Sequence, residues 1–149
     1  MRSIAFLGVL ATIVLITQPA DADVLITKAE AAAPPPPPNI ATSMRGVTRG
    51  PGIEQISPDP NQKIRSPLPL KIKFQIRNNV EIDPASIKLI YLRMEPIDLT
   101  ERIKAHIKSD GITMELADVP PGLHMLRLEL LDKQGRAASL IIKLNVAAD

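Results

Sequence analysis

The chain has 149 residues, a formal net charge of +2 at pH 7, 2% aromatic residues and no cysteine. Without cysteine, the protein can form no disulfide bond and cannot carry the lipid anchor of a lipoprotein. The nearly balanced charge and the scarcity of aromatic side chains, which stack on bases in single-strand binding proteins, argue against a nucleic-acid partner.

The first 22 residues predict a signal peptide. Arg2 gives a positive end to the apolar run Ile4–Ile16, and the small residues of Ala20-Asp21-Ala22 follow it. That run is shorter than the ~20 residues that a transmembrane helix needs. We therefore expect cleavage after Ala22 and a periplasmic or secreted protein, with an uncleaved N-terminal anchor as the alternative. An exported domain without disulfides indicates a bacterial cell envelope.

Residues 23–52 are predicted to form a flexible, proline-rich linker. Pro34–Pro38 is an uninterrupted proline run. Such a run adopts an extended polyproline II rod, about 15 Å long at ~3.1 Å per residue. Proline runs of this kind usually act as spacers, and a ligand for an aromatic groove is the alternative. The sequence leaves open whether Val24–Thr27 adds a strand to the following domain.

Residues 53–146 predict one all-β domain, followed by the short C-terminal tail 147–149. Apolar alternations recur between turn signals, which is typical of a sandwich or barrel of about seven strands. The clearest alternation is in residues 68–77, where apolar side chains alternate with polar and basic ones. Residues 103–108 alternate in the same way and predict another strand. The dipeptide Asp110-Gly111 predicts a tight hairpin turn with positive φ at both positions.

The stretch Val119–Gly135 predicts a central strand between two turns. His124 shares one face of this strand with three leucines. We expect it to point inward at the edge of the core and to make a structural hydrogen bond, because a buried polar group needs a partner. Gly122 and Gly135 are predicted turn residues, and Asp132 is predicted to cap its own turn.

Three motifs carry a resemblance to a known family. They are Ser57-Pro58, the stretch Ile82–Ile87, and Gly122-x-His124 together with Asp132-x-x-Gly135. In these motifs the domain resembles bacterial immunoglobulin-like domains, a group that includes copper-resistance proteins of the periplasm. The resemblance implies an immunoglobulin-like antiparallel β-sandwich. Copper-binding relatives bind the metal through histidine near the mature N-terminus, where this chain has Asp23-Val24, so the resemblance does not carry copper binding over.

The sequence offers no candidate catalytic or cofactor-binding residues. A metal site needs three or four ligands in one place. His106 and His124, the two histidines, lie on different predicted strands and face opposite ways, and the serines lack a neighbouring base. We therefore predict no metal, no cofactor and no enzymatic activity. A periplasmic copper carrier is the first alternative, and an envelope enzyme is the second.

The strand around Tyr91 predicts a possible interaction surface. If Tyr91 points inward, then Ile90 and Leu92 point outward, where aliphatic neighbours are unusual. They could be covered by Val24–Ile26 folding back, or they could form the face that binds a protein partner or a second copy.

A basic stripe of Lys71, Lys73 and Arg77 is the second possible surface. It could contact anionic lipid headgroups, and an ordinary solvated face is the simpler interpretation. Taken together, the sequence predicts an exported, non-catalytic binding or accessory module whose partner is a protein of the cell envelope.

Overall fold

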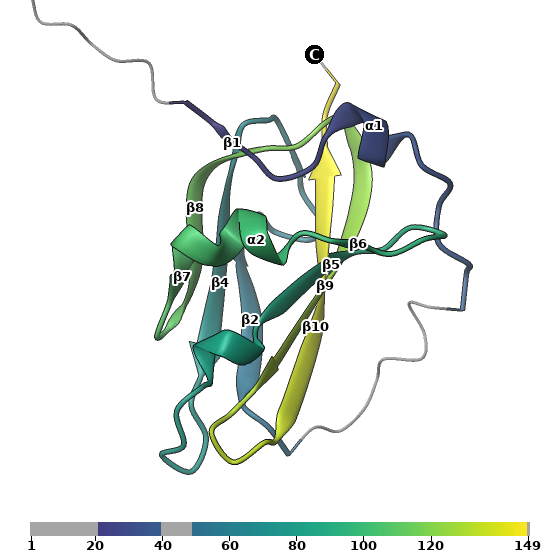
Figure 1. The fold of residues 1–149 in the computed structure, drawn as a ribbon. Coiled ribbons are helices and arrows are strands. Elements are labelled where there is room, and N and C mark those ends of the chain that lie inside the picture. Colours follow the sequence, from purple (N-terminus) through teal and green to yellow (C-terminus); the bar gives the residue numbers. More distant parts are fainter. Residues whose placement is uncertain (1–20, 40–48, 149) are drawn as a thin grey trace, which may run out of the picture.

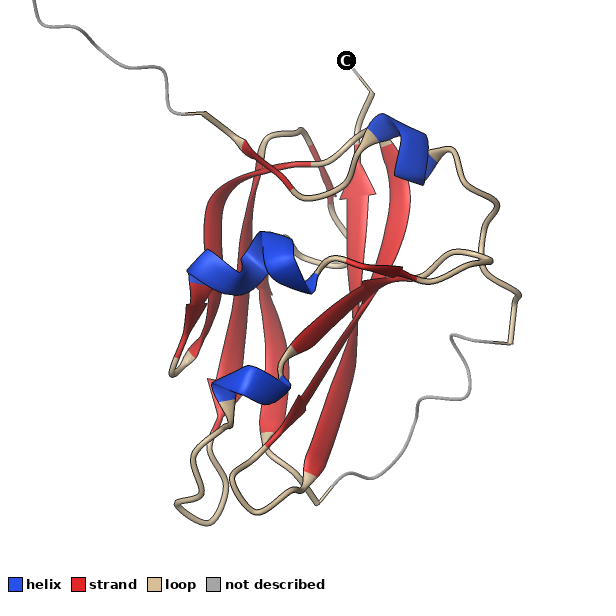
Figure 2. Ribbon diagram, in the orientation of Figure 1, coloured by secondary structure: helices blue, strands red, loops and turns tan. Residues whose placement is uncertain are grey.

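The computed structural model describes residues 21–39 and 49–148, in which two β-sheets enclose one hydrophobic core (Figure 1). The predicted signal peptide lies outside these residues, apart from Asp21 and Ala22. Strands make up most of the ordered structure and the helices are short (Figure 2). The predicted all-β class is therefore confirmed. Neither α-helix of the described region has the length or apolar character of a transmembrane span.

Each sheet has five strands. Sheet 1 contains, in spatial order, β1 (Asp23–Val24), β8 (Gly111–Asp118), β4 (Leu68–Gln75) and β2 (Gly52–Ser57), with β7 (Ile107–Lys108) also paired to β8. Sheet 2 contains β3 (Lys63–Ile64), β10 (Ala137–Val146), β9 (Gly122–Leu131), β5 (Lys88–Tyr91) and β6 (Ile97–Asp98). The helices are α1 (Lys28–Ala31), α2 (Thr100–Ile103) and the 3-10 turns η1 (Pro84–Ser86) and η2 (Lys104–His106).

Alternating side chains build the core. In β4, Leu68, Leu70, Ile72 and Phe74 are buried, while the residues between them are exposed. A strand places successive side chains on opposite faces, so every second residue of β4 points between the sheets. β9 and β10 follow the same pattern in a long antiparallel hairpin, in which all ten residues of each strand are paired.

The prediction of an antiparallel sandwich of about seven strands is wrong in two respects. β1 pairs parallel with β8, and β3 pairs parallel with β10, so both sheets are mixed. The described region also holds ten strands, because β1, β3, β6 and β7 are pairings of two residues each. A two-residue strand is too short to show an alternation in the sequence.

Residues 100–106 are helical, so the predicted strand is wrong there. The Asp98 side chain accepts a hydrogen bond from the Thr100 amide at 2.8 Å and so turns the chain just before α2, whose N-cap is Leu99. Leu99 and Ile103, four residues apart, are fully buried in the core. That spacing matches one face of a helix and explains why the segment coils rather than extends. Only Ile107 and the next residue join the sheet.

The turn residues also differ from the prediction. The β7–β8 hairpin turns at Ser109-Asp110, one residue earlier than predicted, and Gly111 does not have positive φ. Gly111 is required for a different reason, since a Cβ there would lie 2.0 Å from the carbonyl oxygen of Ile72. Two positive φ values in succession occur at Asn78 and Asn79, with φ of 55° and 56°. Asparagine tolerates this conformation better than most residues.

The predicted linker is wrong over its first part, which packs against the domain. We call residues 23–33 the N-terminal strap. Leu25 and Ile26 are 0% and 1% exposed and belong to the core, and β1 extends sheet 1. Thr27 and Glu30 form a capping box that starts α1. In contrast, the described residues of the proline run are mostly exposed. The strap is therefore an integral part of the domain.

The side chain of Gln55 links the two sheets along one edge. The Gln55 amide of β2 donates to the Lys143 carbonyl at 2.9 Å and accepts from the Lys143 amide at 3.2 Å. Gln55 thus bonds the backbone of β10 much as a neighbouring strand would. It ties sheet 1 to sheet 2 along the edge where β2 and β10 meet.

Candidate functional site

His124 lies at the start of β9 and makes two hydrogen bonds. The side chain is 2% exposed. Its Nε2 lies 2.7 Å from the carbonyl oxygen of Pro120, and its Nδ1 lies 2.8 Å from the Tyr91 hydroxyl. A carbonyl only accepts, so Nε2 carries the proton and Nδ1 accepts from Tyr91. Gly122, with φ of 126°, allows the sharp entry into β9 that places His124 over Pro120.

Arg93 completes this buried network. Its guanidinium donates to the Tyr91 hydroxyl and to the Ala31 carbonyl at 2.9 Å, and it lies 4.6 Å above the Tyr91 ring. Burial lowers the pKa of His124, and the Arg93 charge lowers it further against the opposing bond to Pro120. Burial likewise raises the pKa of Tyr91. At neutral pH the histidine is therefore uncharged, and both of its nitrogens are engaged in hydrogen bonds.

Asp132 and Gly135 shape the β9–β10 turn. The Asp132 carboxylate is buried and accepts hydrogen bonds from the Gln134 amide at 2.9 Å and the Arg136 amide at 3.0 Å. It also accepts from Nε of Arg136 at 2.7 Å. Gly135 has φ of 77°, which favours glycine. Both residues thus hold the turn that the sequence predicts around them.

A second polar cluster fixes the N-terminal strap. Arg102 of α2 bonds both carboxylate oxygens of Glu30, at 2.7 and 2.8 Å, and donates to the Leu25 carbonyl at 2.9 Å. The Glu30 side chain is 17% exposed. The bonds from Arg102 lower the pKa of Glu30 to about 2, helped by bonds from Thr27 and opposed by burial. Such a bidentate arginine–carboxylate ion pair is both strong and fixed in geometry.

This pair predicts an acid-dependent stability. The pKa of Glu30 falls on folding from about 4.5 to about 2. The unfolded chain therefore binds a proton first, and the stabilisation is present above pH 4.5 and lost as the pH falls toward 2. We expect this loss to reach about 3 kcal/mol. Glu30→Gln should be less stable at neutral pH and should lack this part of the acid loss, as measured by urea unfolding from pH 7 to pH 2.

Glu101→Gln is the matched control, because Glu101 pairs with Lys104 at 2.8 Å but its side chain is 81% exposed. Exposed pairs contribute little, so its unfolding should follow the wild-type pH profile. Equal pH profiles for Glu30→Gln and the wild type would show that the Glu30 pair does not stabilise the strap.

Ile90 and Leu92, which the sequence predicts to point outward on either side of Tyr91, differ in their exposure. Ile90 is half-buried, whereas Leu92 is 2% exposed, so the prediction of an outward, accessible Leu92 is wrong. The Leu92 amide donates to the Met125 carbonyl at 2.9 Å, which continues the pairing of β5 with β9. Leu25 and Ile26 share a core cluster with Tyr91, which points to the opposite face of β5 from Ile90.

An apolar patch nevertheless lies on the solvent side of sheet 2. Met125 on β9 is its centre, and Leu123 is its neighbour on the same face of the strand. Ile90 of β5 and Ile141 of β10 lie directly opposite Arg127 of β9, one on each side, and diagonally to Met125. We call these four residues the outer patch. Leu123 is 62% exposed, and the other three are half-buried. Of these four residues, the sequence alone indicated only Ile90. The others come together through the register of the paired strands, which is a property of the fold.

The basic stripe is exposed but interrupted. Lys71 and Lys73 point outward from β4, and Arg77 follows the strand. Glu54 of β2 lies directly opposite Lys73 in the sheet. A carboxylate beside the lysines reduces the local positive potential, and this weakens the case for an anionic lipid surface.

The described residues include no group of three or more histidine, cysteine, aspartate or glutamate side chains placed to hold a metal ion. His106 instead lies 3.0 Å from Asp23 of β1. A shallow pocket of about 410 Å³ lies on sheet 2 near the β9–β10 turn, lined in part by Lys88, Glu129 and Ser139. Its lining includes the hydroxyls of Ser86 and Ser139 beside Lys88 and Glu129, but among the described residues none of these four side chains is hydrogen-bonded to another, and Ser86 bonds backbone groups instead.

The sequence does not reveal the residues that organise the two polar clusters. Arg93 and Arg102 reach partners 62 and 72 residues away along the chain, and no local pattern indicates such contacts. Thr27-x-x-Glu30 is the exception, because the capping-box spacing could have indicated a helix start within the predicted linker.

Comparisons with known proteins identify no family. No family model matches the sequence, and no curated protein matches it. Among solved structures, the crystal structure of an engineered protein is similar over 66% of this chain and 20% of its own, with a TM-score of 0.41 and 9% sequence identity. The chain thus spans about a fifth of that protein, and we base no inference on so distant a likeness.

Proposed function

We propose that the protein is an exported, non-catalytic, immunoglobulin-like binding or accessory module of a bacterial cell envelope, with an envelope protein as its partner. The outer patch is the observation that carries this proposal. A solvated sheet face is normally polar, and a group of apolar side chains on it indicates a contact surface. Leu123, the most exposed member, is free to enter a partner's surface.

The position of the strap supports export. The predicted cleavage after Ala22 would make Asp23 the first residue of the mature chain, and Asp23 is the first residue of β1. Processing at this point would leave every residue of the strap in place. The proposed mature protein therefore begins where its first structural element begins.

The buried polar residues favour a binding module over the alternatives. Both nitrogens of His124 are engaged in hydrogen bonds, which leaves no lone pair for copper. Tyr91 is fully buried, so its hydroxyl does not meet a substrate. A lipid-binding face on the lysines of β4 has less support than the outer patch, because Glu54 lies among them.

Crosslinking in the cell envelope tests the proposal. Leu123→Thr combined with Met125→Thr should leave the domain folded, because threonine suits strands. It should reduce the yield of crosslinked partner about tenfold or more, since each lost apolar contact contributes on the order of 1 kcal/mol. Sequencing the N-terminus of the same envelope fraction should find Asp23 or a residue close to it.

Ile56→Thr combined with Ile76→Thr is the matched control. These two isoleucines are 44% and 51% exposed and lie on or beside strands of sheet 1. The control should keep the wild-type partner yield. If the control loses the partner as well, or if the outer-patch variant keeps it, the partner binds elsewhere and the proposed surface is wrong.

A further inference from the structure

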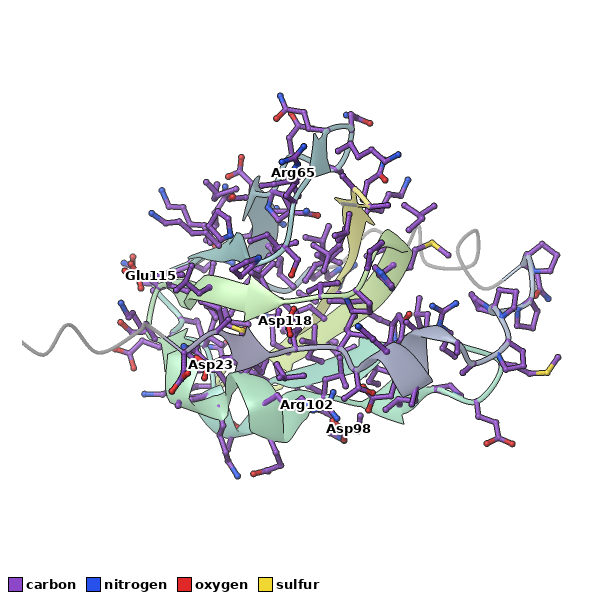
Figure 3. All side chains as sticks on the ribbon, turned by 90° about the horizontal axis from the view of Figure 1, so that it is seen from above. Asp23, Arg65, Asp98, Arg102, Glu115 and Asp118 are labelled. Carbon is purple, nitrogen blue, oxygen red and sulfur yellow. The ribbon has the colours of Figure 1, made fainter. Side chains whose placement is uncertain are left out.

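The proline run Pro34–Pro38 is fixed to the domain where it begins. Viewed from above, the preceding strap runs between β8, marked by Asp118, and α2, marked by Arg102 (Figure 3). The chain then passes from α1 toward the connection between β5 and β6 (Figure 1). There the Pro34 carbonyl accepts a hydrogen bond from the Met94 amide at 3.0 Å. The run therefore starts from a held position on the surface of the domain.

The same domain lies on both sides of the proline run. The strap before it belongs to the core, and Gly50 after it packs against the backbone of Ala137, where a Cβ would lie 2.2 Å from the carbonyl oxygen. A spacer separates two units, whereas this run joins two parts of one domain. Its stiffness therefore calls for an explanation other than spacing.

The exposure of the run has a period of three. Ala33 and Pro36 are half-buried, whereas the exposed residues are Pro34, Pro35, Pro37 and Pro38. A polyproline II rod has about three residues per turn, so residues three apart lie on the same side of it. One side of the rod therefore faces the domain, and the other two sides carry the pairs 34/37 and 35/38 toward solvent.

The two solvent-facing sides offer a defined binding chemistry. A proline has no N–H, so its carbonyl is free to accept from outside, and its ring is apolar. Rigid rods of this kind dock in grooves lined by aromatic side chains, with pairs of rings seated between them. Tryptophan and tyrosine provide both the apolar surface and an N–H or O–H for the carbonyls. Because the rod is already extended, little conformational entropy is lost on binding.

The mature chain does not itself provide such a groove. It has no tryptophan, and its three aromatic residues are Phe6, Phe74 and Tyr91. Phe6 lies in the predicted signal peptide, while Phe74 and Tyr91 are 4% and 0% exposed. A second copy of the mature protein therefore offers no exposed aromatic side chain to the rod, and the partner has to be a different protein.

We propose that Pro34–Pro38 is a docking site for a different protein, one that carries a groove lined by tryptophan and tyrosine. The groove contacts the two exposed sides of the rod, and Met94, which is 63% exposed, borders the contact beside Pro34. This site is separate from the outer patch. The inference goes beyond the proposed function and does not depend on it.

Site-directed photocrosslinking in the envelope fraction tests the contact. The chain has no cysteine, so Pro38→Cys can be labelled at one position with benzophenone maleimide, and the pair 34/37 stays intact. We expect one crosslinked protein, joined through a peptide that contains tryptophan or tyrosine. Pro36→Cys is the matched control, because this position faces the domain, and its yield of the same product should be about tenfold lower or less.

Tryptophan fluorescence tests the chemistry of the contact with the unmodified protein. Because the chain has no tryptophan, the tryptophan emission of a mixture comes from the purified crosslinked protein alone. The emission should change and saturate as the wild-type chain is added. A peptide of residues 33–39 should compete. The same peptide with Pro34→Ala and Pro37→Ala should need about tenfold more or higher, since one side of the rod loses its rings.

The two measurements separate the proposal from other contacts. A crosslink that favours Pro38→Cys, a saturable change in emission and weaker competition by the alanine peptide support docking on the rod. Equal crosslinking yields from Pro38→Cys and Pro36→Cys overturn the proposal. A partner whose tryptophan emission does not change, or equal competition by the two peptides, overturns it as well, and neither peptide result depends on the folding of a variant.

Discussion

Replacing Leu25 and Ile26 together with alanine is expected to lower the free energy of unfolding by about 4–8 kcal/mol. Each side chain is at most 1% exposed and lies in the core. Truncating a buried Leu or Ile to alanine costs about 2–5 kcal/mol, because burial is lost and a cavity remains. Domains of this size have total stabilities of about 5–15 kcal/mol, so the loss should be a large share of the total. Urea unfolding followed by circular dichroism measures the effect.

Val24→Ala provides the control for this experiment. Val24 is the neighbour of Leu25, but it is 49% exposed, and its truncation should change stability by less than about 1 kcal/mol. If the Leu25/Ile26 double variant is as stable as Val24→Ala, the strap is not part of the core. Residues 23–33 would then belong to the flexible linker that the sequence predicts.

Replacing His124 with alanine is expected to lower the free energy of unfolding by about 2–3 kcal/mol. The change leaves the buried Tyr91 hydroxyl and Pro120 carbonyl without their partner, and each such group costs about 1–3 kcal/mol. Tyr91→Phe should also destabilise the domain, because Nδ1 of His124 then lacks its donor. The double variant should lose less than the sum of the two single losses, since both changes break one network.

The same network predicts a pH dependence. Burial and Arg93 hold the pKa of His124 below the ordinary value of 6.5. The unfolded chain therefore takes up a proton before the folded one, so stability is constant above about pH 6.5 and declines as the pH falls below it. His124→Ala should lack this part of the decline. His106→Ala, which removes the half-buried partner of the exposed Asp23, should keep it, and an unchanged pH profile in His124→Ala would contradict the assignment.

The sequence predicts the long strands well and the short elements poorly. β4, β9 and β10 show a period of two over eight to ten residues, and each has its predicted buried face. The strap lacks this period because its buried residues, Leu25 and Ile26, are adjacent rather than alternating. They can both be buried only because the chain there leaves β1 and turns into α1.

The segment after Leu99 shows a second reason why the sequence pattern mispredicts the structure. Apolar residues at 103, 105 and 107 fit a strand, whereas Leu99, Ile103 and Ile107 fit a helix equally well. Short apolar runs do not separate these periods. In the structure the Asp98 side chain turns the chain before α2, and Leu99 and Ile103 are both buried in the core, as one helical face requires. The outer patch is hidden for a related reason, since its members come from three strands whose register is a property of the fold.

The Gln55 bridge has a consequence for how the protein behaves in a crowded compartment. An open edge of β10 would present the amide and carbonyl of Lys143 to any extended chain nearby, and such edges recruit other molecules into aggregates. Gln55 occupies both groups from within the same molecule. The bridge therefore acts as protection against edge-to-edge aggregation as well as a tie between sheets. The exposed charge of Lys143 at the same point of the edge adds to this protection.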